Sequence, residues 1–458
     1  QGVAAAADSR AHRPPARRER GTARLGPTMD LSQETGTSDT VWVAHPDIDG
    51  EWVPGRVTAR NEDGTVSVET EDGRQLAQKA DEVLLTNTLP EQGVEDMQKL
   101  NYLHEPALLH NLSHRFFRDH VYTYTGRICI SINPFNWAVS TPLYTPERLR
   151  SYRGADPDSL PPHVYAIAER AYTAILRRNA GEAAESQSVL VSGESGAGKT
   201  EAVKIMMAFL ADVSCGAEKS QVAERVMQTN PLLESFGNAR TLRNDNSSRF
   251  GKFIEIQFDA QSRMCGACIH IYLLEKTRVV GQAEGERNYH SFYQLLAGAT
   301  EAERARARLR DAQEYRYVNQ SGCMAIEGVD DSVEHGRVRK AMEVIGLSGE
   351  EIDGCFDLLS AILSLSNLAF ASAGDDGDGA AVDSGAQQWL ADAAALTACE
   401  GAEDLSSALC TRRICARDEW YTVPLTVEQA ADSRDALAKA VYGRLFDWLV
   451  ARAKPGRR

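Results

Sequence analysis

The fold class is decided by one short stretch, Gly193-Glu194-Ser195-Gly196-Ala197-Gly198-Lys199-Thr200. It fits the pattern G-x-x-x-x-G-K-[ST], it follows an apolar run at residues 189–191, and it opens a helix-forming segment. Glycines let a backbone curl until successive N–H groups point at phosphate oxygens, and the helix that follows presents its positive dipole end to the same anion. All eight residues are therefore predicted to cradle the triphosphate of ATP.

Two side chains of this loop have predicted roles of their own. Lys199 is expected to reach the terminal phosphates, and the Thr200 hydroxyl is expected to bind Mg²⁺. Some forty residues later, residues 244–253 read Asn-Asp-Asn-Ser-Ser-Arg-Phe-Gly-Lys-Phe. Two adjacent hydroxyls and an arginine before a strand favour a second wall of the same phosphate site. One hydroxyl could complete the magnesium coordination, and the other could hold the attacking water.

The surrounding pattern predicts an α/β fold with a mixed central sheet flanked by helices, of the P-loop NTPase type. Residues 127–134 and 188–192 read as buried strands, and residues 252–259 and 267–274 read as a strand pair joined by a turn. The predicted helices cover residues 162–177, 200–213, 289–296, 333–345 and 435–450.

Residues 40–88 read differently, as short strands with alternating apolar positions. Turn signals stand at Asp49-Gly50, Asp63-Gly64 and Asp72-Gly73. Strands this short and closely spaced predict a small SH3-like β-barrel. Residues 1–39 hold almost no large apolar side chains and are predicted to be disordered. Residues 1–28 are interpreted as translated upstream sequence before a native start at Met29, with a basic arm that binds an acidic partner as the alternative.

Composition narrows the function classes. The net charge of −15 argues against a general nucleic-acid binder, because phosphate affinity comes from clustered Lys and Arg. The nine cysteines are odd in number, and Cys265-x-x-Cys268 has no second pair at zinc-ligand spacing, so reduced thiols are favoured over a metal site. The sequence has no apolar run of bilayer length and no signal-peptide layout. A cytoplasmic protein is expected.

The two phosphate-site elements together resemble the myosin motor head, and the resemblance runs from about residue 40 to about residue 450. Other stretches are similar to myosin blocks: residues 133–135, 230–240, 272–278, 285–294 and 445–449. The resemblance implies an actin-based, ATP-driven motor of the cytoskeleton with ATP and Mg²⁺ bound. It also implies that the small barrel is the N-terminal module of many such heads and that residues 89–458 are the N-terminal and upper part of the motor domain.

The same resemblance assigns roles to single residues. Lys199, Ser247 and Arg249 would be catalytic, because Ser247 positions or relays the proton of the attacking water and Arg249 forms the ion pair that closes the site. Ser248 would join Thr200 on Mg²⁺. Asn244 would contact phosphate. The residues implied beside the adenine are Asn133, Pro134, Phe135 and Tyr144.

The resemblance also implies contact surfaces. Residues 214–221 correspond to a loop that tunes nucleotide exchange, and residues 411–424 and 371–379 resemble actin-contacting loops of the upper head. Glu419 is the candidate actin contact, sixteen positions before Asp435. An actin filament is therefore the expected partner. Light chains and dimerisation are not encoded in these residues.

One expected element is missing from the sequence. A myosin would soon follow residues 445–450 with a strand ending in Asp-x-x-Gly-Phe-Glu, whose glutamate pairs with Arg249, and this sequence ends at Arg458. The absent strand is expected between the phosphate-loop strand and the hairpin at 252–274. Without it, the 458 residues are expected to bind nucleotide weakly and to hydrolyse it negligibly. A truncated record of a working motor is favoured, and a non-motor nucleotide-binding adaptor or an inactive truncated head remains the alternative.

Overall fold

The structure is a computed structural model that describes residues 40–179, 186–215, 221–373, 379–416 and 418–453. The chain divides into two compact units, one up to Pro134 and one from Phe135 onward. The predictions made for residues 1–39 lie outside the described residues.

The first unit opens with an antiparallel five-stranded sheet of order β4-β3-β2-β1-β5. Apolar side chains alternate along its strands, so one face buries a valine-rich core with Val41, Val66 and Val68 fully enclosed. The glycines of the three predicted turns have φ of 80–85°, which confirms those turns. The strands are β1 (Thr40–Ala44), β2 (Trp52–Arg60), β3 (Thr65–Thr70), β4 (Gln75–Lys79) and β5 (Leu84–Leu85).

The predicted closure of this sheet into a barrel is not found. Among the described residues β4 and β5 do not pair, and each forms an open edge of the sheet. β5 is only two residues long, which leaves few backbone groups with which a second neighbour could bond.

The rest of the first unit is helix α1 (Glu105–Phe116) and a hairpin of β6 (Tyr122–Thr125) and β7 (Ile128–Ser131). Arg115 of α1 is buried and donates to the Thr123 hydroxyl at 2.9 Å and to the Tyr122 carbonyl at 3.0 Å. Strand β7 lies within the predicted strand 127–134. The prediction that it is buried is wrong, because Ile128 is 66% exposed and β7 pairs only with β6 among the described strands.

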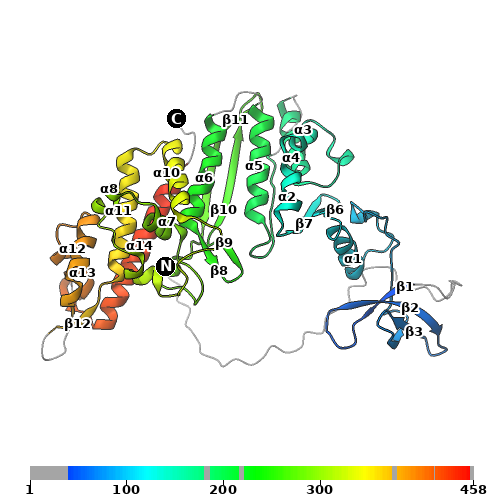
Figure 1. The fold of residues 1–458 in the computed structure, drawn as a ribbon, viewed down its shortest axis with the longest axis horizontal. Coiled ribbons are helices and arrows are strands. Elements are labelled where there is room, and N and C mark those ends of the chain that lie inside the picture. Colours follow the sequence, from blue (N-terminus) through cyan, green and yellow to red (C-terminus); the bar gives the residue numbers. More distant parts are fainter. Residues whose placement is uncertain (1–39, 180–185, 216–220, 374–378, 417, 454–458) are drawn as a thin grey trace. The chain divides into compact units, whose positions relative to one another are not determined.

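The second unit is mostly helical, with antiparallel hairpins between the helices (Figure 1). Its helices are α2 (Trp137–Ser140), α3 (Pro146–Tyr152), α4 (Val164–Asn179), α5 (Lys199–Cys215), α6 (Gln221–Gly237), α7 (His290–Gly298), α8 (Glu301–Arg306), α9 (Arg316–Asn319), α10 (Asp331–Ile345), α11 (Gly349–Ser366), α12 (Gln387–Leu396), α13 (Ala402–Cys410) and α14 (Val427–Arg452). Its strands are β8 (Asn238–Thr241), β9 (Asn244–Ser248), β10 (Gly251–Phe258), β11 (Met264–Tyr272), β12 (Phe370–Ser372), β13 (Ala380–Val382), β14 (Thr411–Ala416) and β15 (Glu419–Pro424).

The five predicted helices are confirmed as α4, α5, α7, α10 and α14, and the predicted strand pair is the β10–β11 hairpin. In Figure 1 this hairpin lies beside α5 and α6. Met207 of α5 packs in one small apolar cluster with Met264 of β11 and Ile254 of β10. The hairpin is therefore fixed to the helix that follows the glycine-rich loop of residues 193–198.

Helix α14 packs against several other segments of this unit through buried aromatic side chains. Tyr442 is fully buried, stacks on Tyr289 at 4.8 Å between ring centroids, and donates its hydroxyl to the Phe236 carbonyl at 2.7 Å. One turn later, Phe446 packs edge-on against Phe250 at 5.2 Å. These contacts tie α14 to α6 and to the segment that follows β9.

The predicted central sheet is not formed by the residues that the structure describes. Residues 188–192, expected as a buried strand, have no strand partner among the described residues, and Leu190 is 92% exposed. Every pairing of two described strands is antiparallel, and the only parallel contact among them is the isolated Asp96–Tyr124 bridge. An extended segment becomes a strand only when a neighbour takes up its backbone N–H and C=O groups. Apolar composition alone therefore misled the prediction at 188–192.

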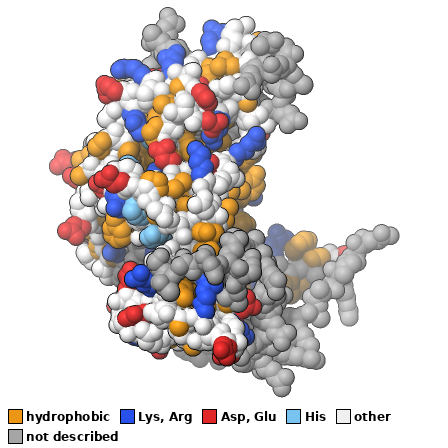
Figure 2. Space-filling view, turned by 90° about the vertical axis from the view of Figure 1, so that its right-hand side faces the viewer, with side chains coloured by type: hydrophobic (Ala, Val, Ile, Leu, Met, Phe, Trp, Pro, Cys, Tyr) orange, Lys and Arg blue, Asp and Glu red, His pale blue; other side chains and the backbone are white. Residues whose placement is uncertain are grey.

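The surface charge and the helix composition of the described chain bear on the predictions as well. Figure 2 shows one face, on which acidic and basic side chains are interspersed and do not gather into a region of a single sign. None of the helices in the described ranges is both long and apolar enough to span a membrane.

Candidate functional site

The loop that precedes α5 has an unusual backbone. The backbone φ angles of Gly193, Gly196 and Gly198 are 154°, 84° and 91°. Residues that have a Cβ atom rarely adopt such values. Helix α5 begins directly afterwards, at Lys199. The first N–H groups of a helix have no partner within it and point toward whatever lies before the first turn. The loop therefore leads directly into the unpaired N–H groups of a helix start.

Lys199 lies folded back over this loop. Its ammonium group donates to the carbonyl oxygens of Gly193 and Glu194, each at 2.7 Å. Both acceptors are neutral, and an ammonium forms stronger hydrogen bonds with an anionic oxygen. A phosphate oxygen that enters the loop would therefore compete well for Lys199.

The β8–β9 hairpin brings the second predicted element against the loop. The Ser247 hydroxyl lies 3.2 Å from the Ser195 hydroxyl, and the Ser248 hydroxyl lies 3.5 Å from the Thr200 hydroxyl. A Cβ built on Gly196 would lie 3.9 Å from the Asn244 Cβ, so the loop also contacts the start of β9. Two segments about fifty residues apart thus form facing walls.

Arg249 belongs to a chain of ion pairs behind these walls. Its Nε donates to Glu275 Oε2 at 2.6 Å, and its Nη1 donates to the Ser247 hydroxyl at 3.3 Å. Arg278 donates to the same Glu275 oxygen at 2.8 Å and pairs with Glu286 at 2.9 Å. Burial alone would raise the pKa of Glu275, but the hydrogen bonds from Arg249 and Arg278 hold it below its ordinary value of 4.5. Glu275 is therefore a charged anchor for Arg249.

Asn246 fixes β9 from the opposite side. Its Oδ1 accepts from Asn238 Nδ2 at 2.8 Å and from His290 Nε2 at 3.2 Å. Burial, with a smaller contribution from the nearby Arg287, lowers the pKa of His290 to about 3. The imidazole is thus neutral at pH 7, and its N–H orients the asparagine that stands directly before Ser247.

A charged cluster joins α5 to α6 below the site. Lys204 pairs with Glu201 at 2.8 Å and with Glu234 at 2.6 Å. Glu234 also accepts from Asn246 Nδ2 at 3.3 Å. Burial lowers the pKa of the neighbouring Lys252. The contacts of Glu234 couple the helix that follows the glycine-rich loop to the strand that carries the serines.

The four residues predicted beside the adenine fall on both sides of the boundary between the two units. Asn133 and Pro134 close the first unit, whereas Phe135 and Tyr144 belong to the second. Phe135 is 82% exposed, and the Tyr144 ring lies 5.7 Å from that of His163. The adenine contacts of these four residues stay a prediction.

The predicted contact loops are described in part. Glu419 is exposed at the start of β15, where its Oε2 accepts from the Tyr421 hydroxyl at 2.6 Å. The β14–β15 hairpin, which covers the predicted loop 411–424, also exposes Trp420. Parts of the other two loops, residues 216–220 and 374–378, lie outside the described residues.

Sequence reasoning missed two residues of this site. Glu275 and Asn246 both lie inside quoted blocks, but neither was given a role. A partly buried arginine needs a carboxylate near it, which is a signal for Glu275 in retrospect. No local sequence signal could pair Asn246 with His290, because the two residues are 44 positions apart.

The fold is a mixture of helices and hairpins, with a glycine-rich loop at a helix start and two serines facing it. These features define the class as a protein with a candidate phosphate-binding site. The family follows from comparison with known proteins. The model of the myosin head (motor domain) family matches residues 94–455, and the chain belongs to this family.

Individual relatives agree with the family model. Myosin-7 of Arabidopsis thaliana is 44% identical over 428 residues, which cover 93% of this chain and 24% of that protein. Myosin-13 and Myosin-17 of the same plant are 42% and 43% identical over 413 residues, covering 90% of this chain and 27% and 26% of theirs. The chain thus spans about a quarter of the length of the curated relatives it matches.

Proposed function

We propose that this chain is the Mg-ATP-binding part of an actin-based motor. The observation that carries the proposal is the pair of hydroxyl contacts across the site, Ser195 to Ser247 and Thr200 to Ser248. They close a donor-rich loop from the side on which a nucleotide's terminal phosphate would lie. Membership of the myosin head family supports the same assignment. On this proposal the loop of residues 193–200 is a P-loop and residues 244–249 are its switch.

The hydroxyl oxygens fit a magnesium ion. Mg²⁺ takes oxygen ligands at about 2.0–2.1 Å in octahedral geometry, so neighbouring ligands lie roughly 3 Å apart. The Thr200 and Ser248 oxygens are 3.5 Å apart, and a small side-chain rotation brings them within that spacing. When bound, Mg²⁺ would neutralise phosphate charge. The two hydroxyls would hold it, with phosphate oxygens and water as the other ligands.

The remaining residues have proposed roles in the attack of water on the γ-phosphate. Lys199 would exchange its two carbonyl contacts for terminal phosphate oxygens. Asn244 would bind phosphate as well, and the Ser247 hydroxyl would position the water. Arg249 would stabilise the closed site, with its guanidinium held by Glu275 in the structure described here. Catalysis of this kind depends on positioning and charge more than on covalent chemistry.

Nucleotide binding is tested by titrating the chain with a fluorescent ATP analogue in Mg²⁺. Lys199→Ala is expected to weaken binding by tenfold or more, since removal of a charge-assisted bond costs about 1.5–3 kcal/mol. Lys340→Ala is the matched control, because Lys340 is an exposed lysine on α10 that pairs only with Glu343 in the described structure. Equal affinities for the two variants would refute the proposed site.

We also propose an actin filament as partner, a location with the cytoskeleton of the cytoplasm, and the sheet of residues 40–88 as a separate SH3-like module. The exposed β14–β15 hairpin with Glu419 is the proposed actin contact in the described residues. Cosedimentation with actin filaments, with and without Mg-ATP, tests this. Binding that ATP weakens and that Glu419→Ala reduces supports the motor. Nucleotide binding without actin binding would favour the adaptor.

A further inference from the structure

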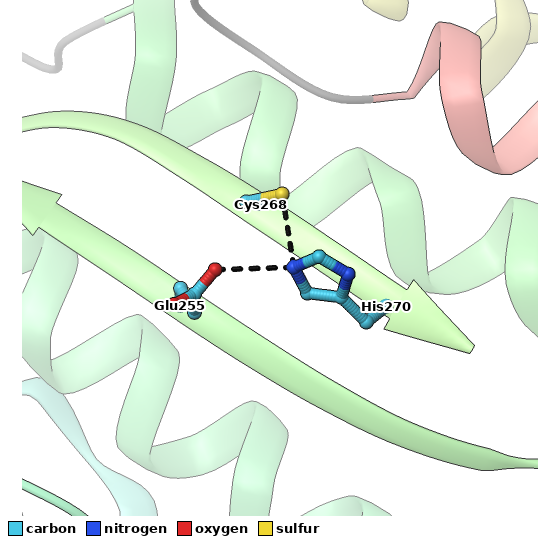
Figure 3. A group of neighbouring side chains, drawn as sticks. All are labelled: Glu255, Cys268 and His270. Atoms are coloured by element: carbon cyan, nitrogen blue, oxygen red, sulfur yellow. Dashed lines mark hydrogen bonds and ion pairs between the residues drawn. The ribbon is translucent and has the colours of Figure 1, made fainter. Parts of the chain in front are cut away.

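The β10–β11 hairpin carries a polar cluster that the nucleotide site does not use. Cys268 and His270 are two residues apart on β11, so their side chains leave the same face of the strand. Glu255 lies directly opposite Cys268 in the antiparallel register. The three side chains converge on this face, as Figure 3 shows. We propose that Glu255, Cys268 and His270 form a binding site for a single zinc-like divalent cation.

The distances between the ligand atoms fit this metal. His270 Nε2 lies 3.4 Å from Cys268 Sγ and 3.1 Å from Glu255 Oε2, and all three atoms lie within 4.8 Å of one another. Zinc binds sulfur at about 2.3 Å and nitrogen or oxygen at about 2.0–2.2 Å, so a tetrahedral site has edges of roughly 3.4–3.6 Å. The two edges at His270 are already within a few tenths of an ångström. A rotation of the Glu255 carboxylate brings the third edge into range.

The chemistry of the three ligands selects the ion. Thiolate and imidazole are ligands that zinc, cobalt and copper prefer, whereas Mg²⁺ and Ca²⁺ bind oxygen ligands. A thiolate and a carboxylate together neutralise a divalent charge. The Cys268 thiol gives up its proton to solvent when it binds the metal, so affinity rises with pH. Three protein ligands leave the fourth position for water.

The three ligand side chains are accessible to an ion from solvent, and the hairpin that carries them is held in place by packing. The side chains of His270 and Glu255 are 41% and 50% exposed, which leaves an open path for an ion. The Phe253 ring lies 6.1 Å from the imidazole, between ring centroids, and is tilted by 30° to it. The opposite face of the hairpin is held by Ile254 and Met264 in the cluster with α5. A bound ion would cross-link the two strands and stabilise the hairpin.

The spacing of cysteines in the sequence did not indicate this set of three ligands. Cys265 and Cys268 stand at a spacing typical of zinc ligands, but Cys265 donates instead to the Gln257 carbonyl. The partner of Cys268 is two residues away rather than three, and Glu255 comes from the neighbouring strand. Only the strand register brings the three ligands together.

The test is a cobalt titration of the reduced, nucleotide-free 458-residue chain. One equivalent of Co²⁺ is expected to produce a thiolate-to-cobalt charge-transfer band that Zn²⁺ bleaches and excess Mg²⁺ does not. Cys268→Ser is expected to abolish the band. His270→Gln and Glu255→Gln should each weaken Co²⁺ binding by about tenfold or more, as loss of even an outer partner of a metal site does. Zn²⁺ should raise the melting temperature of the unchanged chain and not that of these variants.

Cys265→Ser is the matched control, because it removes an exposed thiol from the same hairpin and should keep the band. Absence of a saturable band in the unchanged chain would overturn the proposal, and so would a band that survives Cys268→Ser or disappears in Cys265→Ser. Metal-free melting curves of each variant verify folding. If Cys268→Ser does not fold, the affinities of His270→Gln and Glu255→Gln decide.

Discussion

Arg249 Nε donates to Glu275 Oε2 over 2.6 Å, and this ion pair joins the end of the serine-bearing hairpin to the segment that follows β11. The backbone repeats the connection, since Glu275 N–H donates to the Arg249 carbonyl at 3.0 Å. Side chain and main chain thus hold the same two residues together. The predicted switch residue is therefore anchored within the described chain.

The strength of this pair is predicted to be modest. Both side chains are about one-third exposed, so a double-mutant cycle with Arg249→Ala and Glu275→Ala should give a coupling free energy of about 1 kcal/mol. Urea unfolding of the four variants measures it. The coupling should shrink in high salt, because partly exposed charges are screened. A coupling near zero at low salt would show that the backbone contact alone holds the two segments.

Glu275 also predicts an acid dependence of stability. Its pKa is held below the ordinary value of 4.5, so its stabilising contribution is present above about pH 4.5 and is lost as the pH falls through the lower folded-state pKa. Glu275→Gln should remove this part of the dependence. The measurement is the free energy of unfolding of both proteins between pH 5 and pH 3. Parallel curves would contradict the assignment.

His290 predicts a second acid effect in a different window. Its ordinary pKa of 6.5 falls to about 3 on burial, so between these values the unfolded chain takes up a proton that the folded chain does not. Stability should therefore fall as the pH drops from 6.5 towards 3, by up to about 1.4 kcal/mol per pH unit. His290→Gln should flatten this slope. His163→Gln is the comparison. The pKa of His163 is also lowered to about 3, but this residue lies far from Asn246 in the sequence.

Gly237 at the end of α6 is predicted to tolerate no side chain. A Cβ there would lie 2.6 Å from Phe250 Cδ1 and 3.1 Å from Phe446 Cζ. Gly237→Ala should therefore lower stability by about 1–3 kcal/mol through overpacking. Gly336→Ala on α10 is the control, since a Cβ there meets nothing within 4 Å and alanine favours the helix by about 1 kcal/mol. Thermal unfolding of both variants should shift in opposite directions.

Local pattern was sufficient for some elements and not for others. The helix after the phosphate loop and the β10–β11 hairpin were predicted because glycine, apolar periodicity and turn residues act over a few positions. Helix α14 starts at Val427, eight residues before the predicted start. The capping box of Thr426 and Gln429 marks this start, and the prediction did not take it into account. Helix α6 was not predicted, and it contains Pro231, which normally ends a helix.

The site divides in the same way. The loop glycines and paired serines are readable because each lies in a short motif. The Arg249–Glu275 pair and the Asn246–His290 contact depend on tertiary packing between segments 26 and 44 positions apart. The prediction of a strand at 188–192 was wrong for a related reason. A strand needs a neighbouring strand to pair with, and the sequence of the segment itself does not say whether one is there.

Strand β10 pairs with β11 along one side only among the described residues. Its other side presents a row of backbone N–H and C=O groups, next to the half-exposed ring of Phe253. Such an edge is a template onto which a further extended segment can add, from the same chain or from another molecule. We therefore expect self-association that grows with protein concentration and that a soluble peptide strand suppresses, which sedimentation at several protein concentrations would measure.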